Sequence, residues 1–300
     1  IHAWDTEGAV VLEDLVCTGN VAADNGGCIY ASGRVLVSDA TVMRENVAYI
    51  GGCIFAETDS AITVEDGNFS CIAERNGGFL MVEDGAQANI TGGVISNNVA
   101  GRRGAAVYCR GDSTDLGVPN LLITGGTFTD NEAGEVGGAI VVWGALAVVS
   151  VTGGVFENNS ARFYGGFIFI ELGASASCEG ATIRGNSAGD QGGGIYARDA
   201  PWVTSSCGLL GNVAPQGAAA YLTYVANGAF ENLEVAGSVL ASGGSAVFIT
   251  ASAVSATRVT FQSGDDSMLD AETTETTRAV QLDDNSTFFC DGCVFDGWLG

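Results

Sequence analysis

The hydrophobic and polar positions of this 300-residue chain recur in short units, not in long helical stretches. One such unit, Val151 to Ile170, holds Phe156 and Asn159, followed by a Gly165-Gly166 pair that opens an apolar run. The residues between these markers alternate between apolar and polar types and are rich in β-branched side chains, as in strands. No segment has ten residues of 3.6-residue apolar periodicity with caps, so the sequence predicts about three short strands per unit and almost no helix.

A glycine marks the same step in each unit, and the residues after it are small and then apolar. These glycines recur with a period of about 26 residues, which two longer intervals interrupt, and such a period is typical of solenoids. The aligned positions are Gly26, Gly51, Gly77, Gly104, Gly137, Gly165, Gly192, Gly217 and Gly244, with a degenerate tenth copy from Thr277 to Val280.

An asparagine precedes most of these glycines by five or six residues. A side chain that keeps its phase with the bend is suited to stacking, because in-register amides hydrogen bond from one layer to the next. We therefore expect an amide ladder made of Asn20, Asn46, Asn98, Asn131, Asn159, Asn186 and Asn212.

A unit of three short strands cannot bury its own apolar face, whereas stacked copies form a continuous core. The sequence therefore predicts an all-β fold, a parallel β-helix solenoid of about ten coils with about 26 residues per coil, as a single domain over residues 1–300. A β-propeller is the weaker alternative, since its blades need about 40 residues or more. Two inserted loops interrupt the period, near residues 109–120 and 263–276.

The chain is strongly acidic, with a formal net charge of −24 and 11 basic residues that are all arginine. Nucleic acids and anionic membranes demand basic patches, so neither is an expected partner. The acidic surface is expected to keep a glycine-rich, apolar protein soluble. The longest apolar run, Ala139 to Val151, is too short to span a bilayer, so no membrane insertion by this segment is expected.

Nine cysteines and four N-x-S/T sequons favour an oxidising, extracellular or cell-surface setting. The sequons give the glycosylation candidates Asn68, Asn89, Asn158 and Asn285, and the odd cysteine count leaves at least one thiol free or intermolecular. Since neither end carries a covering segment, we expect a segment of a longer chain or a rod whose ends a partner covers.

Three pairs of cysteines stand out along the sequence. Cys178 and Cys207 lie on neighbouring coils and could form a disulfide. Cys28 and Cys53 replace the usual alanine of the repeat, so we expect them to be small buried thiols. Cys290-x-x-Cys293 has no second pair and no nearby histidine, which argues against a zinc site.

We find no catalytic constellation and no metal site in the sequence, and no cofactor is expected. The chain has no lysine and one histidine, His2. Acidic doublets such as Glu65-Asp66 and Asp283-Asp284 could hold Ca²⁺ if coils brought them together, but none matches a known calcium loop. Solvated turn carboxylates are the favoured interpretation.

Two features suggest recognition of a partner. Arg110-Gly111-Asp112, in the first insertion, matches an integrin-recognised tripeptide and forms a candidate adhesive loop, although a Gly/Asp turn is the favoured interpretation. Aromatic residues such as Tyr30 and Tyr196 align after the glycine step. They could form an exposed stripe for sugars, but a stacked ladder in the core is favoured.

The paired signatures Gly137-Gly138-Ala139-Ile140 and Phe128-x-x-Asn131 resemble the repeat of the chlamydial polymorphic outer membrane proteins and similar surface proteins. The resemblance extends over nearly the whole chain. It implies a right-handed β-helix on an extracellular surface, with adhesive or structural roles, and it transfers no catalytic residue.

The leading hypothesis is a non-enzymatic structural or adhesive surface protein, a rod-like segment of an assembly or filament. Its partners would be other extracellular proteins, copies of itself or glycans. The alternative is a carbohydrate-active or glycan-binding β-helix protein that uses one long face of the rod.

Overall fold

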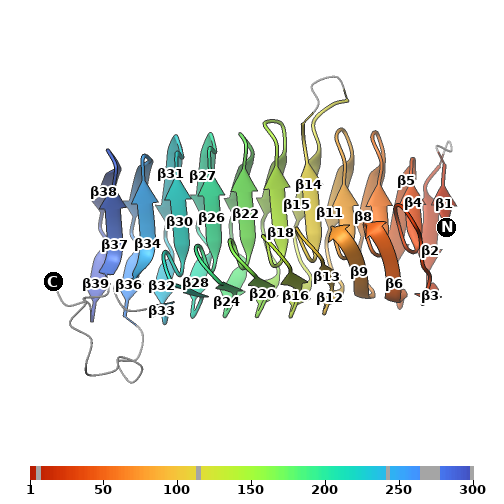
Figure 1. The fold of residues 1–300 in the computed structure, drawn as a ribbon, viewed down its shortest axis with the longest axis horizontal. Coiled ribbons are helices and arrows are strands. Elements are labelled where there is room, and N and C mark those ends of the chain that lie inside the picture. The colour runs from red at the N-terminus through yellow and green to blue at the C-terminus, as the bar shows by residue number, and fades with distance from the viewer. Residues whose placement is uncertain (5–7, 113–115, 241–243, 264–277, 298–300) are drawn as a thin grey trace.

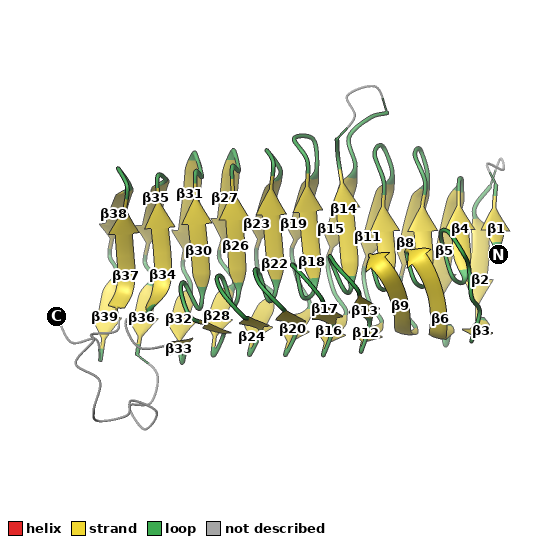
Figure 2. Ribbon diagram, in the orientation of Figure 1, coloured by secondary structure: helices red, strands yellow, loops and turns green. Residues whose placement is uncertain are grey.

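The structure is a computed structural model that describes residues 1–4, 8–112, 116–240, 244–263 and 278–297 (Figure 1). These residues form strands, turns and loops, and none of them is helical (Figure 2). Successive coils stack side by side along a rod, with the two ends of the chain at opposite ends of it (Figure 1). The predicted all-β, parallel β-helix is thereby confirmed.

Three faces, each built from parallel strands, enclose the interior. The first sheet has 11 strands in the order β1 (His2–Ala3), β4 (Ile29–Ala31), β7 (Ile54–Ala56), β10 (Leu80–Val82), β14 (Val107–Arg110), β18 (Ile140–Trp143), β22 (Ile168–Glu171), β26 (Ile195–Arg198), β30 (Ala220–Thr223), β34 (Ser245–Thr250) and β37 (Arg278–Asp283). The second sheet has 11 strands in the order β2 (Val10–Glu13), β5 (Arg34–Ser38), β8 (Ala61–Val64), β11 (Gln87–Ile90), β15 (Asn120–Ile123), β19 (Val148–Val151), β23 (Ser175–Cys178), β27 (Trp202–Ser205), β31 (Asn227–Glu231), β35 (Ala253–Thr257) and β38 (Thr287–Asp291).

The third face holds two parallel rows, which the long strands β6 (Val42–Ile50) and β9 (Asn68–Asn76) connect. The first row continues through β3 (Val16–Thr18), β12 (Val94–Ser96), β16 (Thr127–Thr129), β20 (Val155–Glu157), β24 (Thr182–Arg184), β28 (Gly208–Leu210), β32 (Glu234–Ala236), β36 (Thr260–Gln262) and β39 (Val294–Asp296). The second consists of β13 (Val99–Ala100), β17 (Glu132–Ala133), β21 (Ser160–Ala161), β25 (Ser187–Ala188), β29 (Val213–Ala214) and β33 (Val239–Leu240).

The strand register repeats the period of the sequence. Ile140 pairs with Ile168, and Ile168 pairs with Ile195, so equivalent residues of successive repeats lie side by side. Along each strand, side chains alternate between the interior and the outer surface. In β18, Ile140 and Val142 belong to the main core, whereas Val141 belongs to a separate cluster outside it.

Each glycine of the repeated pair has its own structural reason. Gly165 has a φ of 68°, in the left-handed region that favours glycine. Gly166 has an ordinary φ, but a Cβ there would overlap the carbonyl oxygen of Gly193 on the next coil. The pair therefore makes the bend and also allows the close stacking of adjacent coils.

The asparagines form a ladder inside the rod, along the turn between the two rows of the third face. Asn131 Nδ2 donates to Asn159 Oδ1 at 2.8 Å, and Asn159 Nδ2 donates to Asn186 Oδ1 at 2.9 Å. Each buried amide also bonds to backbone, since Asn159 Nδ2 donates to Phe128 O at 2.9 Å and Asn159 Oδ1 accepts from Asn131 N at 3.2 Å. Similar side-chain bonds join Asn20 to Asn46, Asn98 to Asn131, and Asn186 to Asn212.

A cysteine replaces one asparagine of the ladder, and the ladder ends after Asn212. Cys71 takes the place of an asparagine, and its backbone N–H donates to Asn98 Oδ1 at 2.7 Å. After Asn212 the corresponding residue is Ser238, which is 7% exposed. Within the described part of the chain, Asn212 Nδ2 and Ser238 Oγ have no hydrogen-bond partner.

Four disulfides connect parts of the solenoid, and two of them correct the sequence prediction. Cys28 and Cys53 are not buried thiols, because Cys28 is bonded to Cys17 and Cys53 to Cys71. Cys28 and Cys53 do lie on adjacent coils, but their side chains turn across the coil toward cysteines of the third face, with Cα–Cα distances of 6.2 and 5.4 Å. The structure also forms the Cys178–Cys207 disulfide and a Cys290–Cys293 disulfide.

Cys109 is the one free cysteine among the described residues, which include all nine cysteines. It lies in β14 and is 0% exposed within the main core. Burial raises the pKa of the Cys109 thiol to about 12, with a smaller contribution from the Asp84 carboxylate. The thiolate, which is the reactive form, is therefore suppressed in the folded protein.

A first prediction concerns the ladder. Asn159→Ala removes four hydrogen bonds and leaves their partners buried, so we expect a loss of about 3 to 5 kcal/mol in the free energy of unfolding. Asn20→Ala is the matched control, because Asn20 is exposed and water can replace the lost amide. Equilibrium denaturation measures both, and equal losses would contradict the assigned role of the buried ladder.

A second prediction extends the ladder by one coil. Ser238→Asn would give Asn212 Nδ2 an acceptor and could donate to Leu209 O, as Asn186 donates to Phe156 O. We expect a gain of about 1 kcal/mol in the free energy of unfolding, the typical net contribution of a hydrogen bond. Denaturation of Ser238→Asn beside Ser238→Ala tests this, and a Ser238→Asn variant no more stable than Ser238→Ala would refute it.

A third prediction concerns the cysteines. Without reductant, a thiol reagent should label no cysteine in the folded protein and one per chain after denaturation, because Cys109 is buried and the rest are paired. Mass spectrometry of the labelled chain gives the count. The Cys109→Ala variant should remain unlabelled in both states, and labelling at any other cysteine would show that a disulfide is missing.

Candidate functional site

Both charged side chains of the Arg110-Gly111-Asp112 tripeptide are paired with charged groups of the protein. Arg110 Nε donates to Asp112 Oδ2 at 2.7 Å, and Arg110 Nη1 lies 3.5 Å from Glu83 Oε2. Burial raises the pKa of Glu83, and the neighbouring Arg110 opposes that rise. Gly111 is buried against the following coil. The Arg110 and Asp112 side chains are therefore already bound to groups of this protein.

The four sequons lie in two kinds of environment. Asn158 and Asn285 are exposed and have positive φ values of 55° and 54°, as asparagines in tight turns often do. Asn68 in β9 and Asn89 in β11 are half-buried within strands. The turn positions therefore offer the more accessible side-chain amides. The second predicted insertion, 263–276, lies outside the described residues except for Ser263.

A row of large side chains covers the outer face of the first sheet. Rings stack from coil to coil, with centroids 5.1 Å apart for Phe169 and Tyr196 and 5.4 Å apart for Tyr196 and Tyr221. The predicted stacking is confirmed, but its predicted position in the core is wrong, because these residues form a cluster separate from the main core. The row in strand register is Tyr30, Phe55, Met81, Tyr108, Val141, Phe169, Tyr196, Tyr221 and Phe248.

A groove of about 230 Å³ lies over this row where it crosses β18, β22 and β26. Its floor is formed by Phe169 and Tyr196. One wall comes from the ends of the same strands, where Trp143 pairs in register with Glu171 and Arg198 follows on the next coil. The other wall comes from a row of single bridges in which Arg103, Val136 and Tyr164 follow one another; Tyr164 stacks on Tyr196 at 4.8 Å.

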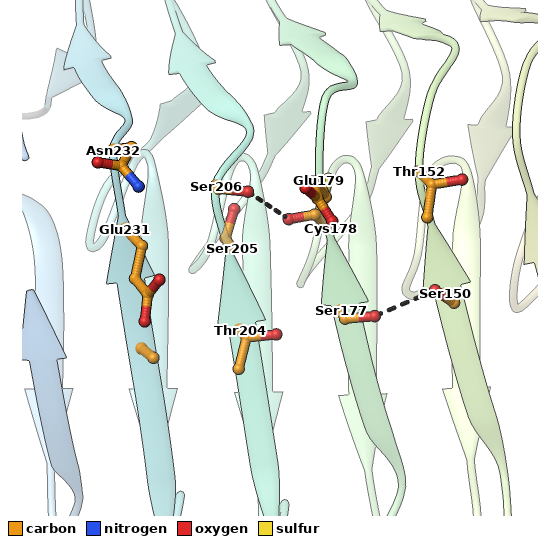
Figure 3. Close-up of a pocket in the computed structure, with 11 residues that line it drawn as sticks. Ser150, Thr152, Ser177, Cys178, Glu179, Thr204, Ser205, Ser206, Glu231 and Asn232 are labelled. Atoms are coloured by element: carbon orange, nitrogen blue, oxygen red, sulfur yellow. Dashed lines mark hydrogen bonds between the residues drawn. The ribbon is translucent and has the colours of Figure 1, made fainter. Parts of the chain in front are cut away.

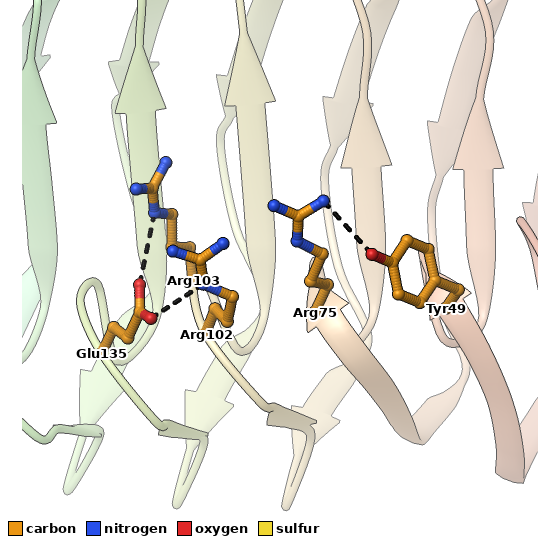
Figure 4. A network of polar contacts seen from close by, with 5 residues as sticks. All are labelled: Tyr49, Arg75, Arg102, Arg103 and Glu135. Carbon is orange, nitrogen blue, oxygen red and sulfur yellow. Dashed lines mark hydrogen bonds and ion pairs between the residues drawn. The ribbon is translucent and has the colours of Figure 1, made fainter.

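Arginine–carboxylate pairs stand on both walls of the groove. On the bridge side, Glu135 Oε1 accepts from Arg102 Nε at 2.8 Å, and Glu135 Oε2 lies 3.6 Å from Arg103 Nε (Figure 4). The Arg103 guanidinium lies 4.2 Å from the centroid of the Trp143 ring, so it reaches from one wall to the other. On the strand side, the exposed Arg198 forms an ion pair with Glu171, which is only 3% exposed.

Burial alters the titration of the tyrosines in the aromatic row. It raises the pKa of Tyr108 to about 12, against the lowering effect of Arg103. Burial also raises the pKa of Tyr196, with smaller contributions from Tyr221 and Tyr164. These phenols are neutral at physiological pH, so the row is an apolar surface with hydroxyl groups and carries no charge of its own.

A second, more polar groove of about 380 Å³ lies on the outer face of the second sheet (Figure 3). Hydroxyl side chains line it in register, and Ser177 Oγ donates to Ser150 Oγ at 3.2 Å. Thr204 follows on the next coil, and Glu179 and Glu231 add carboxylates. Among the described residues that line this groove none is aromatic, so they offer hydrogen bonds but no ring surface for a ligand.

Within the ranges that the structure describes, no group of three or more histidine, cysteine, aspartate or glutamate side chains is placed to hold a metal ion. The same ranges contain no helix long and apolar enough to cross a membrane.

Sequence reasoning found the floor of the aromatic groove but missed its walls. The alignment of Tyr30 with Tyr196 predicted the stacking of the row but favoured a place in the core. Arg103, Glu135 and Tyr164 lie between the asparagine and glycine markers, where the residue type changes from coil to coil. The one available signal was their place one or two residues before the glycine step.

The comparisons with known proteins support the architecture. A family model for the Chlamydia polymorphic membrane protein repeat matches residues 180–198. The matched stretch contains β24, Asn186 of the ladder, the Gly192-Gly193 step and β26, which together form most of one coil. No curated protein and no solved structure matches the chain.

The repeat named for these membrane proteins indicates a surface or outer-membrane protein. Together, the matched repeat and the parallel β-solenoid fit a family of β-helix proteins of the polymorphic membrane protein type.

Proposed function

We propose that this chain is a non-enzymatic extracellular rod that serves as a structural or adhesive segment of a surface assembly. The observation that carries the proposal is the uninterrupted stacking of coils, with 11 strands in each of the first two sheets. Because each coil contacts mainly its neighbours, such a solenoid holds an extended outer surface in a fixed shape. Long surfaces of this kind are suited to contacts with partners.

The disulfides and the sequons support an extracellular location for this rod. Disulfides persist in oxidising compartments, and four of them connect segments of this chain. Asn158 and Asn285 present sequons in exposed turns, where glycan attachment would not disturb the core. Other extracellular proteins, copies of the same chain and glycans are the partners that such a surface could contact.

The formal charge of −24 influences the choice among these partners. Two copies of the chain repel each other electrostatically at long range, which disfavours non-specific self-association. Basic or neutral partners do not meet this barrier. We therefore place adhesion to a different molecule ahead of self-assembly.

The test is adhesion of coated beads to cultured cells. Beads carrying the folded chain should be retained more strongly than beads carrying the same chain after reduction and alkylation, because reduction removes the four disulfides that hold the surface in shape. Retention is counted under flow at increasing shear.

Two results would count against this proposal. Equal retention of folded and reduced chains would show that adhesion does not depend on the rod. Release of new reducing ends or unsaturated products from a panel of polysaccharides, lost on denaturation, would show an enzyme instead.

A further inference from the structure

We propose that the groove over β18, β22 and β26 is a binding site for neutral, hexose-containing glycans. The inference rests on the proposed surface function, for which it names a class of ligand. It is carried by three features that occur together in the groove: partly exposed aromatic rings, arginine–carboxylate pairs on both walls, and a size suited to a sugar ring.

The rings of the groove stack in nearly parallel planes, so neighbouring rings cover the faces of Phe169 and Tyr196, which are 3% and 4% exposed. Phe169 and Tyr196 are inclined by 2°, Trp143 and Phe169 by 19°, and Tyr164 and Tyr196 by 24°. The C–H face of a pyranose ring is apolar and slightly positive, so it packs on the negative face of an aromatic ring. Trp143 and Tyr164 are only partly buried, which leaves part of their rings for a ligand.

The walls supply donors and acceptors at the same time. A guanidinium has five N–H donors and a carboxylate about four acceptor positions, so the Arg198–Glu171 and Arg103–Glu135 pairs leave both kinds of group for a ligand. A sugar hydroxyl both donates and accepts, and it therefore satisfies such a pair better than a ligand that only accepts. Groups bonded to charged partners also give the stronger hydrogen bonds.

Charge balance favours a neutral ligand over an acidic one. The arginines on the groove walls are already engaged by Glu135 and Glu171, so an anionic sugar would have to compete with two carboxylates. The overall charge of −24 also repels a polyanion as it approaches. A neutral glycan meets neither obstacle.

The dimensions set the length of ligand that the groove can hold. Its volume of about 230 Å³ lies below the range of about 300 to 1,000 Å³ usual for drug-sized ligands. The groove is thus suited to a single sugar ring or a short oligosaccharide that continues along the rod. The second groove, over β19, β23 and β27, lacks the ring surface and is not part of the proposal.

The experiment uses the intact purified chain on an array of neutral and acidic oligosaccharides, followed by calorimetric titration with the best neutral binder. Trp143→Ala should weaken binding at least tenfold, because it removes one of the partly exposed rings. Trp202→Ala is the matched control: Trp202 is also partly buried but begins β27 on the second sheet, and its loss should leave affinity unchanged.

A second variant and a second readout protect the test against misfolding. Arg198→Gln removes an exposed charged group from the other end of the strand-side wall and should also weaken binding severalfold. Ligand addition should change the tryptophan fluorescence of the wild type and of Trp202→Ala, and this change should disappear in Trp143→Ala. Each variant is first shown by circular dichroism and thermal unfolding to keep the fold.

Several results would overturn the inference. These are an array without a neutral binder, binding confined to acidic or sulfated glycans, binding confined to a peptide ligand, and affinity unaffected by Trp143→Ala in a folded protein. The bead assay keeps the two proposals distinguishable. If Trp143→Ala beads adhere like wild-type beads, adhesion stands without the glycan site; if no bead adheres but the glycan binds, the site stands without adhesion.

Discussion

The hydrogen bonds between successive coils are the interaction on which the rest of this structure depends. Every coil satisfies its backbone through its neighbours, as when Ile140 pairs with Ile168 and Ile168 with Ile195. A buried amide that is not paired costs on the order of 1 to 3 kcal/mol, so the Asn159 side chain is stable inside only when its neighbours present matching groups. A slip by one residue would leave these groups unpaired and turn each strand's apolar side chains outward.

The fixed register inside also determines what the outside can be. Because Phe169, Tyr196 and Tyr221 are equivalent residues of successive coils, their rings stack at intervals set by the strands. The ion pairs between neighbouring coils, such as Arg184 with Glu157 and Arg198 with Glu171, follow from the same spacing. The packing of the core therefore determines where the side chains of the groove lie.

The sequence predicted those parts of the structure whose residues recur in most repeats. Phe156, Asn159 and Gly165 recur with nearly the same spacing in most repeats, so their roles could be inferred from many copies at once. The disulfides of Cys28 and Cys53 could not, because each forms across a single coil with a partner, Cys17 or Cys71, that has no counterpart in other repeats. A pattern averaged over coils conceals a contact that occurs within one of them.

The same reasoning explains why the sequence did not reveal the walls of the groove, and why a binding site should be sought where the repeats differ. An inward position such as Ile140 must fit the stacked core, so its residue type is narrowly limited. The outward row is different, because equivalent positions on three successive coils hold a cation, a neutral ring and an anion: Arg110, Trp143 and Glu171. Surface substitutions away from special features usually change stability by about 0.5 kcal/mol or less, so this row is free to differ from coil to coil. A site that distinguishes one ligand from another needs such local difference, and over β18, β22 and β26 the difference places a tryptophan between two arginine–carboxylate pairs.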